Sequence, residues 1–317
     1  MAKFFVSFTL CIVLVLKAEW VELAHVFRNC NQYFLSIAFG GMVGGVFLSA
    51  YKWQVLLRIH TISVGFWTLS RYYFTAVFFN NFLPSNIGGD AYRIYKTVSL
   101  NTSGAVVAIL VERITGLWAF IVLGCLGAIW LYFFSDAIKP SWLYSALWFL
   151  VACACVPPLA GIFLISNPFL KKKIRKLSRK IRVFFERTID YKGQPLSAVY
   201  VLIISFFFQL YTLGWMLILT RAVQEPIVAY KLIIGMVLSN LVALLPISLN
   251  GIGLLDGSFI FTMSAMGMPY DKALMVMLLI RCALLPLSLV GCIFYLQERN
   301  RSGANLSVIA NQLWKEK

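Results

Sequence analysis

The sequence is poor in charged residues, and this shortage excludes most classes of soluble protein. Asp, Glu, Lys and Arg make up 13% of the 317 residues, whereas a soluble domain carries about 25%. Hydrophobic residues make up 61%. Their runs are continuous for about 20 residues, which matches the hydrocarbon thickness of a bilayer, and they do not alternate as barrel strands do. We therefore predict an all-α polytopic membrane protein.

Residues that commonly build metal sites and catalytic centres are scarce or scattered. The only histidines are His25 and His60, which excludes a His-rich metal site. The seven cysteines lie mostly inside apolar runs and form no CxxC pair, which is typical of small buried hydrophobic side chains. The sequence has no GxSxG, HExxH, P-loop or DxD motif. We predict no metal, no cofactor and no enzymatic activity.

Acidic residues are few, and the excess of basic residues lies mainly in one segment. The chain has 28 Lys and Arg residues against 12 Asp and Glu, a net charge of +16, and half of this charge lies within residues 168–195. Apolar residues at three- and four-residue spacing over residues 170–190 predict an amphipathic helix on the membrane surface. We expect this loop to be cytoplasmic, with residues 171–192 binding anionic lipid headgroups and not nucleic acid.

The apolar segments divide one integral membrane domain, residues 1–317, into two halves. Half 1 covers residues 1–167 and half 2 covers residues 196–317, and we predict that they form a pseudo-repeat with about eight transmembrane helices in all. Because 104–134 exceeds one span, residues 99–113 either line the interior or form the second limb of a re-entrant hairpin. The candidate spans are residues 4–17, 33–51, 64–83, 104–134, 141–166, 196–220, 227–248, 251–267 and 272–296.

The number of crossings decides which side the basic residues face. Five complete crossings before the cytoplasmic loop would place the N-terminus, Lys52 and Arg58 outside, against the usual charge bias. Counting residues 99–134 as two limbs, or 4–17 as a non-spanning anchor, reverses that result. Four crossings after the loop would place the C-terminus in the cytoplasm. Two groups are typical of interface anchors: Lys52-Trp53 and Arg71-Tyr72-Tyr73.

Two stretches broken by Gly and Pro, residues 80–96 and 244–259, interrupt the apolar helices. Irregular backbone is tolerated at membrane depth only where protein or a water-filled cavity surrounds it. Two interruptions in comparable positions of two halves indicate the binding site of a transporter, and a re-entrant hairpin is one arrangement for each. The turn residues are Pro84, Gly88 and Gly89 in the first break and Pro246, Gly251 and Gly253 in the second.

Asp90 follows the glycine pair of the first break and is suited to cap the helix that begins there. A helix N-terminus favours an anion such as a phosphate. Arg93 and Lys96, three residues apart on one face of this helix, would add a headgroup clamp. The alternative is an interfacial turn with cations that reach toward the headgroups.

Other ionisable residues lie within apolar segments and need partners. Glu112 and Arg113 are adjacent on a helix and therefore face different directions. They are candidates for function, or for a structural ion pair of Glu112 with Arg93 or Arg281. Arg281 has no neighbouring acid in sequence, and Asp256 or Asp271 would serve as its partner. The candidate substrate-binding residues are Asp90, Arg93, Glu112, Arg113, Asn250, Asp256 and Arg281.

Three blocks of the sequence carry a family resemblance. They are N-x-LP-x-x-x-GGD-x-x-R (Asn81, Leu83, Pro84, Gly88, Gly89, Asp90, Arg93), ER-x-x-GL (Glu112, Arg113, Gly116, Leu117) and P-x-S-x-x-G-x-G (Pro246, Ser248, Gly251, Gly253). In these blocks the chain resembles the lysylphosphatidylglycerol synthase transmembrane-region family, also described as flippase-like or UPF0104 membrane proteins. It departs from the family in having Asp256 where a glutamate is common.

The resemblance implies a flippase-like membrane region without aminoacyl transfer, because the sequence ends at Lys317, soon after its last predicted span. We predict a transporter that moves or binds an anionic or lipid-linked headgroup of a phospholipid, glycolipid or polyprenyl-phosphate precursor across the bacterial inner membrane. One alternative is a non-catalytic accessory subunit that serves a glycosyltransferase or a lipid synthase. A second is an intramembrane transferase acting on a lipid headgroup.

Overall fold

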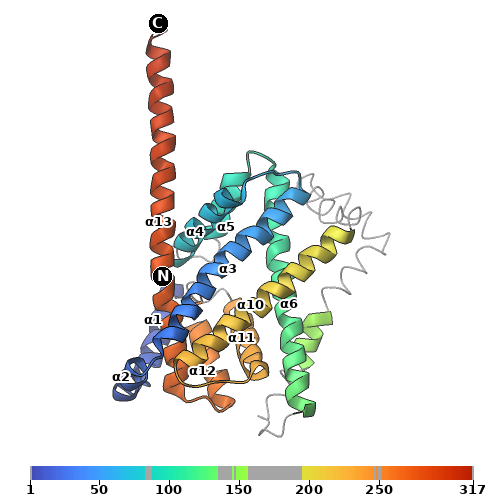
Figure 1. The fold of residues 1–317 in the computed structure, drawn as a ribbon, viewed down its shortest axis with the longest axis vertical. Helices are drawn as coiled ribbons and strands as arrows, with labels where there is room; N and C mark the ends of the chain where they lie inside the picture. Colours follow the sequence, from blue (N-terminus) through green and yellow to red (C-terminus); the bar gives the residue numbers. More distant parts are fainter. Residues whose placement is uncertain are drawn as a thin grey trace.

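The fold was described from a computed structural model, which covers residues 2–82, 88–134, 145, 148–155, 195–245, 248 and 251–315. This part of the chain consists of helices joined by short connections and contains no strand (Figure 1). Its principal helices are α1 (Ala2–Leu16), α2 (Trp20–Arg28), α3 (Gln32–Ile59), α4 (Phe66–Phe82), α5 (Gly88–Thr97), α6 (Thr102–Phe134), α10 (Pro195–Ala222), α11 (Ala229–Ala243), α12 (Leu254–Ala265) and α13 (Tyr270–Lys315).

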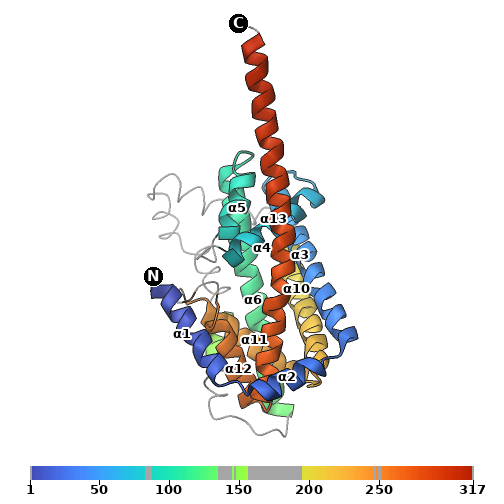
Figure 2. The same ribbon diagram turned by 90° about the vertical axis from the view of Figure 1, so that its left-hand side faces the viewer.

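Four helices are long and apolar enough to cross a membrane: α3, α6, α10 and α13. The others are less apolar or shorter, and α11 and α12 are short helices of apolar composition. The prediction of an all-α polytopic membrane protein is therefore confirmed. Helix α13 continues well past the bundle at its C-terminal end (Figures 1 and 2).

Helices α3 and α10 pack along each other in opposite directions on one side of the bundle (Figures 1 and 2). Glycines on α3 permit this close approach, because a side chain at Gly41 or Gly44 would overlap Trp215 or Tyr211 of α10. Three hydrogen bonds fix the antiparallel register: Asn31 N to Ala222 O at 2.9 Å, Tyr211 OH to Gly41 O at 2.9 Å, and Tyr51 OH with Tyr200 OH at 2.8 Å.

Each of these two helices begins a set of four with the same plan. Helices α3 and α10 both have 28 residues. In each set, six residues lead to a short helix, a break leads to a second short helix, and four residues lead to a long helix. The sets are therefore α3–α6 and α10–α13. Because α3 and α10 are antiparallel, the second set is inverted relative to the first, as in transporters built from inverted repeats.

The two sets are interlocked. Helix α4 of the first packs on α13 of the second, and α11 of the second packs on α6 of the first. The predicted pseudo-repeat is thus present as an inverted one. The boundary predicted for the halves lies in the basic loop 168–195, and that loop falls outside the described residues apart from its last residue, Pro195.

Helices α4 and α5 form a hairpin that enters and leaves the bundle at one end. The connections before and after it are adjacent, since Asn101 donates to His60 O at 3.2 Å. Helices α11 and α12 form an equivalent hairpin, because Lys272 Nζ donates to Gln224 O at 3.1 Å across its two connections. In Figure 1 the two hairpins occupy the upper and lower parts of the bundle. Both broken elements therefore form hairpins, and these enter the bundle from opposite ends.

This arrangement changes the predicted count of crossings. The segment 64–83 forms α4, the first limb of a hairpin, and so does not cross the bundle as a full span. The second limb is α5, and residues 102–113 belong to the continuous helix α6 instead. The end of α3 lies beside the start of α10, where the hydroxyls of Tyr51 and Tyr200 are 2.8 Å apart.

Candidate functional site

Asp90 is the centre of an ion-pair cluster on the first hairpin. It is the third residue of α5, and its side chain is buried. Its Oδ1 accepts from Arg93 Nη2 at 2.5 Å, and its Oδ2 accepts from the guanidinium of Arg113 on α6. One carboxylate therefore holds two arginines, one from each side of the turn between α5 and α6.

Glu112 is the second carboxylate of this cluster. It accepts from Arg93 Nη1 at 2.8 Å and from the Tyr73 hydroxyl at 2.8 Å. Arg93 thus bridges both acids, and its guanidinium lies 4.5 Å from the ring centroid of Tyr73 and 5.1 Å from that of Trp53. Of the two partners expected for Glu112, Arg93 is correct. Buried charges persist only when they are paired and hydrogen-bonded, and these are.

Lys52 of α3 joins the cluster, although the sequence suggested an interface anchor. Its side chain is only 4% exposed, and its Nζ donates to the Glu112 main-chain oxygen at 2.9 Å. Trp53 is fully buried. The anchor interpretation of Lys52-Trp53 was wrong, because α3 is covered here by α4, α6 and α10. The position of Lys52 inside a 28-residue apolar helix was the signal that could have identified it.

The cluster lines a cavity of about 420 Å³ between the two sets of helices. Its charged side chains come from α3, α5 and α6. The amides of Gln209 on α10 and Asn240 on α11 also line it, and they donate to Gly116 O at 3.0 Å and to Met236 O at 2.8 Å. Asn80 closes the tip of the hairpin by accepting from Gly89 N at 2.8 Å. A side chain at Gly89 would overlap the Ala76 carbonyl and Asn80, so the close contact of α4 with α5 requires glycine.

The second hairpin carries one ion pair at the equivalent place. Arg281 of α13 donates to Asp256 of α12 through two bonds, of 3.1 and 3.0 Å. Asp256 also accepts from Gly253 N at 2.9 Å and so caps its own helix. Gly251 and Gly253 have φ of +70° and +80°, the left-handed conformations that favour glycine. Of the two predicted partners of Arg281, Asp256 is therefore the one observed.

This second ion pair lines a separate cavity of about 380 Å³. Apart from Asp256, Arg281 and Asn81, its lining is almost wholly apolar, and the adjacent residue Asn80 lines the first cavity. Arg281 is thus not on the wall that holds Arg93 and Arg113. Lys96, predicted to form a clamp with Arg93, pairs instead with Glu298 at 3.0 Å.

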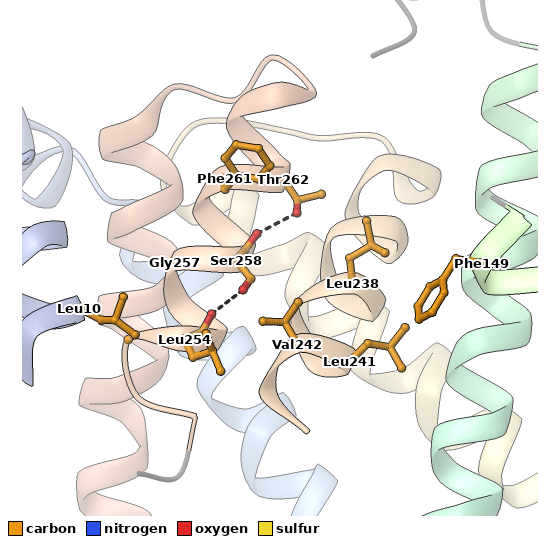
Figure 3. Close-up of a pocket in the computed structure, with 11 residues that line it drawn as sticks. Leu10, Phe149, Leu238, Leu241, Val242, Leu254, Gly257, Ser258, Phe261 and Thr262 are labelled. Atoms are coloured by element: carbon orange, nitrogen blue, oxygen red, sulfur yellow. Dashed lines mark hydrogen bonds between the residues drawn. The ribbon is translucent and has the colours of Figure 1, made fainter. Parts of the chain in front are cut away.

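A third cavity, of about 580 Å³, is almost wholly apolar (Figure 3). It lies between α1, α11, α12 and the short helical segment at Phe149. Its two hydroxyls are used within α12, since Ser258 donates to Leu254 O at 2.5 Å and Thr262 donates to Ser258 O at 2.8 Å. The cavity therefore presents a hydrocarbon-like surface with no unsatisfied hydroxyl.

Several predicted residues cannot be placed in this site. Pro84, Pro246, Asn250 and the basic segment 171–192 fall outside the described residues. Within the part that the structure covers, no group of three or more His, Cys, Asp or Glu side chains could hold a metal ion.

Comparisons with known proteins identify the family of this chain. The family described as the lysylphosphatidylglycerol synthase TM region matches residues 1–291. A UPF0104 membrane protein of Methanocaldococcus jannaschii is 28% identical over 242 residues, which cover 71% of this chain and 96% of the relative. No solved structure matches the chain. Since the family match covers most of the sequence, the chain belongs to the lysylphosphatidylglycerol synthase TM region family.

Proposed function

We propose that this chain is a flippase-like transporter that binds an anionic or lipid-linked headgroup and moves it between membrane leaflets. The observation that carries this proposal is the 420 Å³ cavity, which is lined by buried charges and formed at a broken helix within a membrane-spanning bundle. Ionisable residues in such positions are expensive to bury and commonly mark a substrate site. A purely structural cluster would have no need of a cavity beside it.

The inverted repeat supports movement rather than simple binding. Two re-entrant hairpins enter from opposite ends, and each carries an Asp–Arg pair beside a cavity. In transporters of this plan, one repeat rocks against the other and exposes the site to each side in turn. The headgroup would occupy the charged 420 Å³ cavity while its acyl chains remain in the surrounding lipid. The chain itself would act without catalysis, alone or beside a glycosyltransferase or lipid synthase.

The charge distribution supports a cytoplasmic position for the end of the bundle where α3 ends and α10 begins. Arg58, Arg71 and Lys96 lie at this end, and the predicted basic loop leads into α10. Short cytoplasmic loops carry an excess of Lys and Arg. In this orientation the C-terminus is also cytoplasmic, because α13 runs toward the same end (Figure 2). The membrane would be the bacterial inner membrane.

The test is leaflet exchange by the purified full chain in liposomes, measured with labelled phospholipids and polyprenyl-phosphate lipids. Asp90→Asn should abolish exchange, because Asp90 holds both Arg93 and Arg113. Asp271→Asn is the matched control, since Asp271 only accepts from the Glu19 main chain at 3.3 Å at the bundle surface. Absence of exchange for every lipid, with a folded protein, would refute transport and favour the accessory-subunit hypothesis.

A further inference from the structure

The two halves of the inverted repeat share one Asp–Arg ion pair, but the other charged side chains that surround this pair in the first half have no charged counterparts in the second. Asp90 and Asp256 are each the third residue of their short helix, and Arg113 and Arg281 are each the twelfth residue of their long helix. The fold therefore uses an Asp–Arg pair at this place in both halves. Whatever the first half has beyond this pair is not required by the shared architecture.

Three charged residues of the first half have apolar counterparts in the second. Counted along the equivalent helices, the counterparts are Trp215 for Lys52, Phe259 for Arg93 and Ile280 for Glu112. Phe259 is 1% exposed, so the second half fills this position with ordinary core packing. Because burying a charge is costly, packing alone does not explain Lys52, Arg93 and Glu112.

The first cavity carries one positive charge in excess. Lys52, Arg93 and Arg113 face Asp90 and Glu112, whereas the second cavity has only the neutral pair of Arg281 with Asp256. None of the described carboxylates forms an ion pair with Lys52. Its Nζ has three donors, and the Glu112 carbonyl accepts one of them. A buried cation in this position is stabilised by an anion that enters the cavity.

We propose that Lys52 determines the charge of the ligand: the first cavity accepts a phosphodiester headgroup with one net negative charge and disfavours a zwitterionic headgroup of similar size. Lys52 would bind the phosphodiester directly. The amides of Gln209 and Asn240 each use one N–H on a main-chain oxygen, and the second N–H of each would donate to the uncharged substituent. Arg93 and Glu112 hold each other and position Lys52 through the Glu112 main chain. This inference rests on the proposed function only in taking the ligand to be a lipid.

The experiment is equilibrium binding to the purified full chain in detergent micelles, by competition against a fluorescent phosphatidylglycerol. Unlabelled phosphatidylglycerol carries one negative charge, and phosphatidylethanolamine is the zwitterionic competitor. We expect phosphatidylglycerol to bind at least about tenfold more tightly than phosphatidylethanolamine. This factor corresponds to the lower end of the range for one hydrogen bond to a charged group. Lys52→Met should remove most of this preference, and Lys52→Arg should keep it. Lys272→Met is the control, because Lys272 pairs with Glu225 on the surface.

The outcomes separate this inference from the proposed function. Equal binding of the two lipids by the parent protein, or an unchanged preference in Lys52→Met, would overturn it even if leaflet exchange occurs. Selective binding that depends on Lys52 supports it even if no exchange is observed, a result that would refute transport alone. Competition by inorganic phosphate at the same concentration as the lipid would identify a water-soluble anion as the ligand and overturn the lipid assignment.

Discussion

Replacing the buried pair of Arg93 and Glu112 gives the sharpest test of how this site is built. Arg93→Met leaves Glu112 without its cation in a place that is nearly inaccessible to solvent, since the two side chains are 4% and 9% exposed. Loss of one partner of a buried pair costs about 3–5 kcal/mol. The double variant Arg93→Met/Glu112→Met removes both charges and approaches the apolar composition of the second half, which has Phe259 and Ile280 at the equivalent positions.

The double variant should therefore be more stable than either single variant. Two apolar side chains of similar volume restore much of the lost stability, because the desolvation cost of both ions disappears. A residual loss of about 1–3 kcal/mol is expected, because the Tyr73 hydroxyl loses its acceptor. Adding Tyr73→Phe to the double variant should recover this residual loss of stability, because the unpaired hydroxyl is then absent. Binding of phosphatidylglycerol should nevertheless be weakened in all of these proteins.

The measurement is equilibrium unfolding in mixed detergent micelles, followed by tryptophan fluorescence. A double-mutant cycle on Lys272 and Glu225, whose side chains are 26% and 30% exposed, is the control and should show a coupling of about 0–1 kcal/mol. If the double variant of Arg93 and Glu112 is no more stable than the single variants, the two side chains are not a buried, coupled pair. If it is stable and binds lipid normally, the cluster is structural and the proposed site is wrong.

Three further predictions follow from the fold. Gly291→Ala should lower both stability and lipid exchange, because its Cβ would overlap the backbone of α4 at the contact between the two repeats. Gly214→Ala is the control, since Gly214 has open space around it. It should change the free energy of unfolding by no more than about 0.5 kcal/mol and leave the rate of lipid exchange unchanged. Asp256→Ala removes an ion pair and the cap of α12 together, and should cost about 2–4 kcal/mol in thermal unfolding. Thr61 lies in the connection before the first hairpin and Gly267 in the connection after the second, so the two should face opposite sides of the membrane. In a background without native cysteines, a membrane-impermeant thiol reagent should therefore label Thr61→Cys from one side and Gly267→Cys from the other. Labelling of both variants from the same side would contradict the inverted repeat.

The sequence alone determined the class of protein and the location of its irregular backbone. Hydropathy and the hydrogen-bonding needs of a chain in hydrocarbon are local properties, so the apolar segments and the breaks at 80–96 and 244–259 could be read directly. The same local argument marked Asp90, which directly follows Gly89, and Asp256, which lies three residues after Gly253; both lie in the first turn of a helix. Which helices cross the bundle, however, depends on where the chain turns back. The sequence of a break does not show whether the chain turns back there or continues across.

The tertiary structure decided which charges meet. Arg93 had two acids available from sequence position alone, and it uses both, because α5 and α6 place Asp90 and Glu112 on either side of its guanidinium. Arg281 is separated from that cluster because α13 belongs to the opposite repeat. Lys52 was misread for the same reason: a lysine flanked by tryptophan has the same local sequence at a membrane interface and in a protein interior. Only the packing of α3 against α10, α4 and α6 removed it from solvent and directed its ammonium group into the cavity.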